Sequence, residues 1–130
     1  MISVLEPEVV WNDAKPLIEK ALKKYPDYGW TIEDVRKAVD TKDLQLWIDA
    51  ETPKIAVLTK IVEQPSALQC WIWLAGGELP DNWEEHLSDI EKWAKWLGCD
   101  YILEQGREGW QRKLGWERRY VVTQKRLKDA

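Results

Sequence analysis

The sequence lacks the features of several large protein classes. No apolar run reaches the roughly 18–20 residues that a membrane-spanning helix needs, and Met1–Glu6 lacks the ordered charged and apolar regions of a secretory signal. Cysteine is scarce, and Cys70 and Cys99 alone are too few to build a zinc site. The single histidine, His86, has no second histidine at metal-ligand spacing. We therefore expect a reduced, cytoplasmic protein with no membrane association and no metal.

The short motifs of common enzyme classes are also absent. There is no Gly-x-Ser-x-Gly nucleophile motif and no Walker phosphate-binding motif. The sequence shows no nucleophile with a base at motif spacing. Cys70 falls in the middle of a predicted strand and is expected to be an inert core thiol.

Phenylalanine is missing altogether, whereas tryptophan occurs ten times in 130 residues. Tryptophan either replaces phenylalanine in an ordinary core or provides large anchors for an interface. Trp96 lies well off the apolar stripe of its predicted helix and is the best candidate for an exposed tryptophan. Trp110, Trp47 and Trp30 also have no obligatory place in a core.

Charge is distributed unevenly along the chain, although its net value is only −4. Residues 107–130 carry eight basic and three acidic side chains, whereas the other 106 residues carry eleven basic and twenty acidic ones. A basic end on an acidic body is either a site for an anionic ligand or partner, or one solvated edge strand. The low net charge disfavours nucleic acid as the partner. The predicted partner-binding residues are Trp96, Trp110, Arg118 and Arg119.

The apolar periodicity predicts an α/β (α+β) chain that forms one domain over residues 1–130. Residues 67–75 are apolar on both faces, which places this strand in the middle of a sheet. The strand has Leu68, Cys70, Ile72 and Leu74 on one predicted face and Trp71 and Trp73 on the other. The predicted order is β-α-α-β-β-β-α-β-α-β. Strands are predicted over 2–5, 44–49, 54–62, 67–75, 100–104 and 116–127, and helices over 11–25, from Thr31 to about 39, from Asp81 to about Leu97, and over 110–114. Thr31 is predicted to cap the second helix, with Asp34 three residues later in a weaker version of the capping box.

Residues 73–86 combine the end of a strand, two glycines and the start of a helix, an order that is typical of a phosphate cradle. Asp81 is the predicted N-cap of the helix, and Glu84 completes a capping box. These carboxylates, with Glu78, occupy the end of the helix that a phosphate would need. The glycines are therefore interpreted as an inherited turn and not as a working cofactor loop.

The order of elements resembles the fold of the GCN5-related N-acetyltransferase (GNAT) family. The phrase from Trp110 to Glu117, WQRKLGWE, resembles that family's short-helix-to-strand phrase. The segment from Gly98 to Trp110 also looks like small phage-encoded proteins of this fold. The resemblance implies a central mixed, mostly antiparallel sheet flanked by helices.

In the family, a Gln/Arg-x-x-Gly-x-Gly/Ala stretch binds the pyrophosphate of coenzyme A. Gly76 matches that motif, whereas Trp73 and Glu78 depart from it. The family's proton-donating tyrosine aligns with Gln111, which has no acidic proton to give. Asp49 and Glu63 are candidates for a general base, with no feature that singles out either. The cofactor-binding residues that the resemblance implies are Leu74, Ala75, Gly76, Gly77, Asn82, Arg107 and Arg112.

Two functions follow from this sequence. The first is a GNAT-like protein, encoded by a phage, that has weakened or lost acyl transfer and acts by binding a virion component, a host protein or a second copy of itself. The departures at Glu78 and Gln111 and the surplus of tryptophan motivate it. The alternative is an active acetyl-CoA-dependent N-acyltransferase.

Overall fold

The computed structural model describes residues 2–3, 7–24, 29–49, 54–105, 112–118 and 122–128. The predicted elements up to residue 104 are present, with bounds that differ by a few residues from those expected. They are β1 (Ile2–Ser3), α1 (Trp11–Lys24), α2 (Ile32–Asp40), β2 (Gln45–Ile48), β3 (Ile55–Gln64), β4 (Ala67–Gly77), α3 (Trp83–Trp96) and β5 (Tyr101–Glu104). A short 3-10 helix that was not predicted, η1 (Pro7–Val9), lies between β1 and α1.

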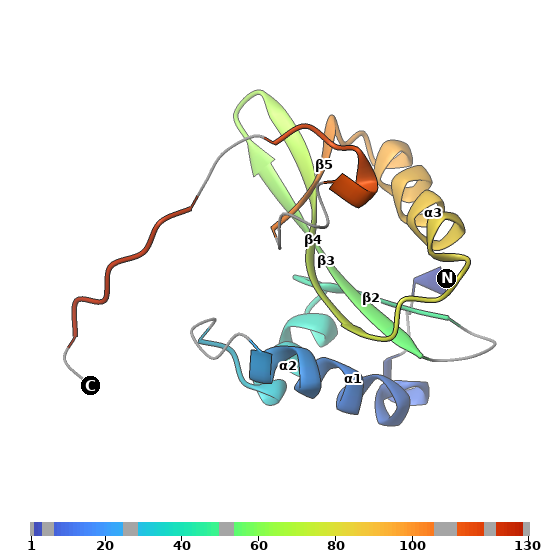
Figure 1. Ribbon diagram of the computed structural model, residues 1–130, viewed down its shortest axis with the longest axis vertical. Helices are drawn as coiled ribbons and strands as arrows, with labels where there is room; N and C mark the ends of the chain where they lie inside the picture. Colours follow the sequence, from blue (N-terminus) through green and yellow to red (C-terminus); the bar gives the residue numbers. More distant parts are fainter. Residues whose placement is uncertain are drawn as a thin grey trace.

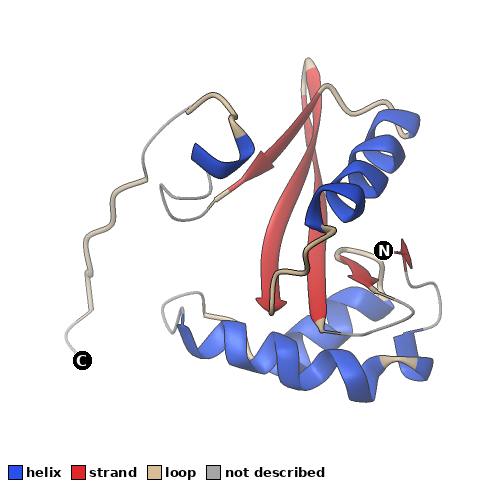
Figure 2. Cartoon of the chain, turned by 45° about the vertical axis from the view of Figure 1, so that its right-hand side comes forward, coloured by secondary structure: helices blue, strands red, loops and turns tan. Residues whose placement is uncertain are grey.

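The strands form a five-stranded sheet in the order β1-β2-β3-β4-β5. The first three pairings are antiparallel, and the pairing of β4 with β5 is parallel. Helices α1 and α2 lie on one side of the sheet and α3 lies on the other (Figure 1, Figure 2). The predicted class, a mixed and mostly antiparallel sheet flanked by helices, is therefore confirmed.

Two apolar cores hold the helices to the two faces of the sheet. The core under α1 and α2 contains Ile18, Val35, Leu46, Leu58 and Leu74. The core under α3 is smaller, and the apolar residues of α3, β2, β3, β4 and β5 that build it are Trp47, Ile55, Val57, Cys70, Ile72, Ile90, Trp93, Ala94 and Ile102. Strand β4 contributes to both cores, as its two apolar faces predict.

The predicted capping box at the start of α2 is confirmed. The Asp34 amide donates to the Thr31 hydroxyl oxygen at 3.1 Å, and the Thr31 amide donates to the Asp34 carboxylate at 2.9 Å. These bonds satisfy two backbone donors that a helix N-terminus leaves without partners. They lower the pKa of the Asp34 carboxyl below its usual value.

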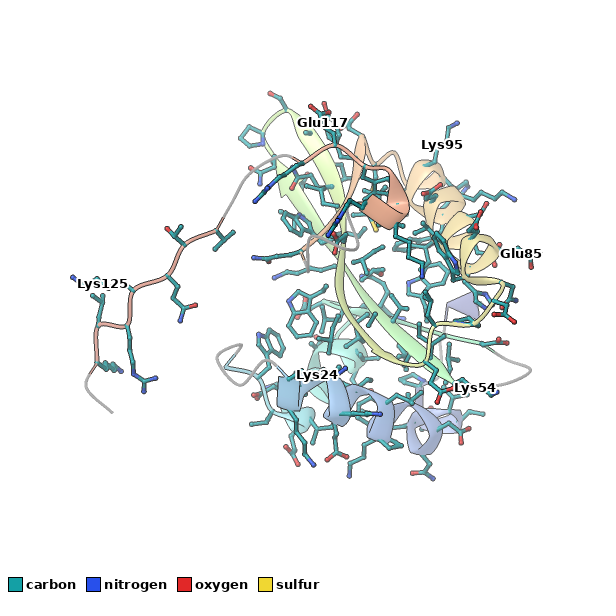
Figure 3. The ribbon with its side chains drawn as sticks, viewed as in Figure 1. Lys24, Lys54, Glu85, Lys95, Glu117 and Lys125 are labelled. Carbon is teal, nitrogen blue, oxygen red and sulfur yellow. The ribbon has the colours of Figure 1, made fainter. Side chains whose placement is uncertain are left out.

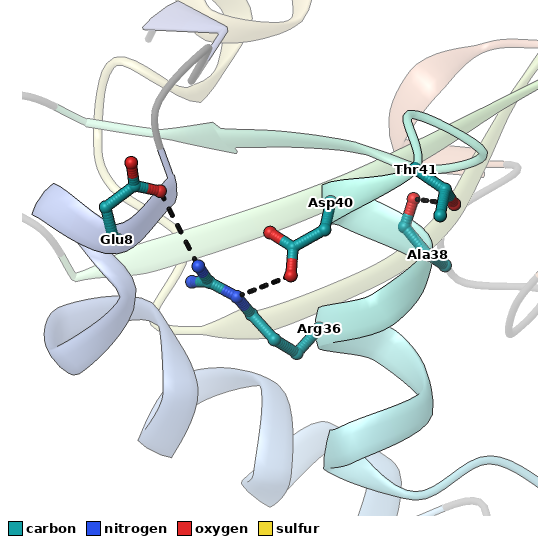
Figure 4. Close-up of polar contacts among 5 residues, drawn as sticks. All are labelled: Glu8, Arg36, Ala38, Asp40 and Thr41. Atoms are coloured by element: carbon teal, nitrogen blue, oxygen red, sulfur yellow. Dashed lines mark hydrogen bonds and ion pairs between the residues drawn. The ribbon is translucent and has the colours of Figure 1, made fainter.

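Arg36 fastens α2 to the N-terminal segment (Figure 4). Its guanidinium lies 3.2 Å from the Asp40 carboxylate, 3.6 Å from the Glu8 carboxylate and 5.1 Å from the centre of the Trp11 ring. The Trp11 ring and the two carboxylates together orient the Arg36 guanidinium between η1, α1 and α2. This corner supports the helical layer that covers β4.

The predicted faces of β4 are wrong at one position because the strand contains a β-bulge. Ile72 pairs with Thr59 and Leu74 pairs with Leu58, so Trp73 is an extra residue on β4. An extra residue reverses the alternation of side chains beyond it. Leu74 therefore joins the core under α1 and α2, together with Trp73, and not the core that contains Cys70 and Ile72.

The predicted final strand is not formed in the residues that the structure describes there. Residues 112–114 are helical, but residues 116–118 and 122–127 belong to no strand. Residues 122–128 are exposed and extend away from the sheet (Figure 1). Alternation of apolar and polar residues was therefore not sufficient to form a strand here, although the outer edge of β5 has no strand partner among the described residues.

Candidate functional site

Strands β4 and β5 separate halfway along β4 (Figure 2). Their parallel pairing covers Gln69 to Ile72 on β4 and ends where Ile72 pairs with Glu104. Residues 74–77 of β4 continue alongside β3 but have no strand partner on the β5 side among the described residues. Backbone groups that point away from β3 over this stretch are placed to hydrogen-bond a ligand. We call the opening between β4 residues 73–77 and the end of β5 the splay.

The bulge lies at the closed end of the splay, next to the last paired residues. The Trp73 ring is half-buried and meets the Trp30 ring edge to face, with centroids 4.8 Å apart. Both rings pack against the core under α1 and α2. The bulge therefore places an aromatic wall on the α1/α2 side of the splay. Bulges often re-aim side chains next to active sites.

The two glycines are the last residues of β4 and do not form a free turn. Gly76 pairs with Ala56 and Gly77 pairs with Ile55. A Cβ on Gly76 would lie 2.1 Å from the Leu17 carbonyl oxygen of α1, so glycine is needed where the helix crosses the strand. Gly77 has φ +114° and no space beside Lys54. The turn interpretation is corrected: packing requires both glycines, whatever ligand the splay holds.

The start of α3 differs from the prediction. The N-cap is Asn82, not Asp81, and its side chain makes no capping hydrogen bond. The predicted capping box of Asp81 and Glu84 is therefore wrong, because the chain enters the helix one residue later, after a Trp83 amide bond to the Pro80 carbonyl. No side chain caps the N-terminal amides of α3, but the Trp83 amide donates to Pro80 and the Glu85 amide donates to the Asn82 carbonyl at 3.1 Å. The positive end of the helix dipole remains open to an anion.

Carboxylates surround this helix start. Glu78, Asp81, Glu84 and Glu85 are all exposed, and Figure 3 shows Glu85 at the first turn of α3. Exposed carboxylates interact favourably with the helix dipole and are screened by water and salt. They weaken the attraction for an anion without blocking it.

The helical turn 112–114 brings positive charge to the same place. The Lys113 ammonium lies 5.5 Å from the centre of the Trp83 ring, on the first residue of α3. Arg112, a predicted cofactor-binding residue, is the preceding residue of this turn and is exposed. Sequence analysis assigned no role to Lys113. Arg107, Trp110, Gln111 and Arg119 lie outside the described residues.

Glu104 is the carboxylate that sequence reasoning missed. It is the last residue of β5, it is half-buried, and its pairing with Ile72 places it at the closed end of the splay. Burial raises the pKa of its carboxyl above the usual value. The sequence does show that Glu104 ends a short predicted strand. It does not show that this side chain is buried, because its burial depends on where β4 and β5 separate.

The carboxylates predicted as general bases lie elsewhere. Glu63 is exposed near the far end of β3, paired with Leu68. Asp49 follows β2, and its carboxylate lies 3.3 Å from the Nε2 atom of His86, which is buried on α3. Glu63 therefore lies away from the predicted cofactor-binding residues, whereas Asp49 lies close to the start of α3, because the His86 amide donates to the carbonyl of Asn82.

The tryptophans divide between surface and core. Trp96 is 80% exposed, as expected. Trp47 is only 3% exposed, and its indole N–H donates to the Thr59 hydroxyl at 3.0 Å, so Trp47 is a core residue and not a surface anchor. Trp30 is half-buried against Trp73.

Arg118, a predicted partner-binding residue, is exposed, as such a residue would be.

Two further expectations concern absences. Over the described ranges, no group of three or more His, Cys, Asp and Glu side chains is placed to hold a metal ion. No helix in the described part of the chain has both the length and the apolar character required to cross a bilayer.

Burial raises the pKa of the Cys70 thiol to about 12, as expected for a core thiol of low reactivity.

Comparison with known proteins supports the fold through structure alone. No protein-family model matches the sequence, and no curated protein is similar to it. An aminoglycoside acetyltransferase from an uncultured soil metagenomic sample, solved with sisomicin, superposes with a TM-score of 0.68 at 12% identity, over 98% of this chain and 95% of that one.

Two further acetyltransferases have similar structures. A putative acetyl transferase from Pyrococcus furiosus has a TM-score of 0.66 at 13% identity over 97% of both chains. An aminoglycoside 6'-N-acetyltransferase from Acinetobacter haemolyticus has a TM-score of 0.65 at 13% identity over 98% of both chains. The chain therefore has the GNAT-type acetyltransferase fold that its sequence resembles.

Proposed function

We propose that this chain is an acyltransferase that binds acetyl-CoA in the splay and transfers the acetyl group to an amine. The observation that carries the proposal is the separation of β4 from β5, which leaves residues 74–77 without a strand partner on one side. Solved structures of the same fold are acetyltransferases, and two of them act on aminoglycosides by name. An aminoglycoside or another polyamine is therefore a reasonable first acceptor to test.

The residues at the splay suit such a donor. The backbone of Leu74, Ala75, Gly76 and Gly77 would hydrogen-bond the amide groups of its pantetheine arm. The uncapped helix start at Asn82, with Arg112 and Lys113 beside it, would hold the pyrophosphate. Arg107 stays a predicted cofactor-binding residue, because it lies outside the described residues. The four exposed carboxylates argue for moderate affinity.

Isothermal titration of the full chain with acetyl-CoA tests the proposal. We expect binding in the micromolar range that weakens as salt is raised, because the phosphate contacts are ionic. Arg112→Ala should weaken binding several-fold, whereas the matched variant Lys95→Ala, at the other end of α3, should not. Absence of heat at millimolar acetyl-CoA would reject the proposal.

A second function is favoured by one specific observation, the exposed Trp96 ring. A protein that has weakened or lost acyl transfer could use this ring, with Trp110, Arg118 and Arg119, to bind a protein partner or a second copy of itself. If the phage resemblance holds, the partner is a virion component or a host protein in the cytoplasm.

Sedimentation of the wild type and of Trp96→Ala tests the self-association form of this function. A wild-type dimer that the substitution dissociates, at unchanged melting temperature, would support it. A monomer at all concentrations would reject self-association, and tight acetyl-CoA binding with turnover would reject the loss of activity.

A further inference from the structure

We propose that Glu104 supplies the proton that the departing thiolate takes up during acyl transfer. The inference rests on the proposed function. It names a donor for the protonation of the thiolate, a step for which the family resemblance provides no residue in this chain. Gln111 stands at the position of the family's proton-donating tyrosine, and an amide has no acidic proton. Another side chain, or water, must therefore donate.

The strand register places Glu104 at the point where β4 and β5 separate. Glu104 is the last residue of β5 and pairs with Ile72, and Trp73 at the bulge follows directly on β4. A donor whose pantetheine arm lies along β4 residues 74–77 would have its thioester at this closed end. Glu104 is the described carboxylate of the sheet that lies there.

The face on which Glu104 lies agrees with a role toward the leaving group. Paired residues of neighbouring strands point to the same face of a sheet, and Ile72 belongs to the core under α3. Ile102, two residues before Glu104 on β5, belongs to the same core. Glu104 is thus on the side of α3, whose N-terminus would hold the donor's phosphates, whereas Trp73 and Trp30 lie on the opposite side.

The surroundings of Glu104 favour a proton on its carboxyl. The side chain is half-buried, and desolvation alone raises its pKa, with no contribution from a charged neighbour. A carboxyl whose pKa moves toward neutrality exchanges protons more readily at the working pH.

The step balances in atoms and charge. The amine nitrogen bonds to the thioester carbonyl carbon, the carbon–sulfur bond breaks, and sulfur leaves with its electron pair. The Glu104 carboxyl gives its proton to that sulfur and becomes a carboxylate. The proton that nitrogen loses on becoming an amide returns, through water, to the carboxylate, so the products are the amide and the free thiol.

The decisive experiment compares the full-length wild type with Glu104→Gln, Glu104→Asp and the control Glu91→Gln, an exposed carboxylate on α3. Acetyl-CoA is the donor, and the acceptors are an aminoglycoside and a polyamine. We expect Glu104→Gln to lower kcat about a hundredfold, with unchanged calorimetric affinity for acetyl-CoA. Glu104→Asp should recover part of the rate, and Glu91→Gln should match the wild type.

The leaving group separates an acid from a base. An aryl thioester of acetic acid expels a thiolate of low pKa that needs no proton. Glu104→Gln should therefore lose far less rate with the aryl thioester than with acetyl-CoA. An equal loss with both donors would overturn the inference, because it would make Glu104 a base or a structural residue.

A readout without turnover completes the test. Infrared titration of the apo protein, as the difference between wild type and Glu104→Gln, should show a carboxyl that loses its proton above the usual range for glutamate. An ordinary titration would overturn the inference, as would an unchanged kcat in Glu104→Gln beside an active wild type. A wild type that binds no acetyl-CoA would instead reject the proposed function and this inference with it.

Discussion

At the scale of single residues, the tryptophans show how little the residue type says about location. Trp47 is buried and its indole N–H reaches Thr59, whose hydroxyl in turn donates to the Gln45 side chain at 2.9 Å. Trp96 lies on the opposite surface of α3 and is exposed. The indole N–H suits both locations, because it can donate to a protein group when the ring is buried and to water when the ring is exposed.

This contrast gives a matched pair of variants. Trp47→Ala should lower the free energy of unfolding by about 3–5 kcal/mol, since it opens a cavity and removes the indole N–H that donates to the Thr59 hydroxyl. Trp96→Ala should change it by less than about 0.5 kcal/mol. Urea unfolding followed by circular dichroism measures both, and similar losses for the two would contradict the division between core and surface.

At the scale of elements, helix starts and strand ends decide what the site can hold. Helix α2 has a complete capping box, whereas α3 has no side-chain cap. The capped helix is closed to a ligand at its N-terminus, because Thr31 and Asp34 already use the amide groups there. The start of α3 has no side-chain cap, although its Trp83 and Glu85 amides donate to the carbonyls of Pro80 and Asn82.

The α2 cap makes a pH-dependent contribution to stability. Because folding lowers the pKa of Asp34, its contribution is complete above the ordinary pKa and is lost as the pH falls through the lowered value. The difference in unfolding free energy between wild type and Asp34→Asn should therefore be full at neutral pH and vanish in strong acid. Glu33→Gln, in the same first turn but outside the box, is the control, and urea titrations at several pH values measure both.

The crossing of α1 over β4 predicts a folding defect at Gly76. In Gly76→Ala the new methyl group would meet the Leu17 carbonyl, so we expect a loss of about 1–3 kcal/mol, or more if the helix cannot shift. Thermal unfolding measures the loss. Gly98→Ala separates the two possible causes of a loss, because Gly98 has φ +92° but open space for a Cβ, whereas Gly76 has no positive φ and its Cβ would meet the backbone of α1. A stable Gly76→Ala that fails only to bind acetyl-CoA would show that this glycine serves the ligand and not the packing.

At the scale of the whole molecule, the described chain consists of a packed sheet with three helices and a basic C-terminal segment. Residues 122–128 are exposed throughout, with Leu127 88% exposed, and Figure 3 shows Lys125 far from the sheet. Among the described residues, no strand pairs with the outer edge of β5. The charge asymmetry of the sequence is thus divided in space: residues 122–128 extend away from the acidic body, whereas Lys113 lies beside the start of α3.

Truncation tests the independence of this segment. Deleting residues 122–130 should shift the melting temperature by less than about 2 °C, because the described residues there are all exposed and bury little apolar surface. Deleting residues 112–130 should lower it further, because that change also removes Lys113 from the Trp83 ring and the half-buried Leu114. A large shift in the shorter deletion would mean that the segment pairs with an edge of the sheet in solution.

The sequence by itself determined the elements up to residue 104, the cap of α2, the central position of β4 and the exposure of Trp96. These depend on local periodicity and on hydrogen bonds between residues three apart, which a single segment of chain contains. Only the tertiary structure decided the bulge at Trp73, the need for Gly76, the uncapped start of α3 and the burial of Glu104. Each of these depends on the register of two strands or on the approach of a helix from a distant part of the chain. No local pattern of residues encodes such contacts, because the partner that creates them is not adjacent in the sequence.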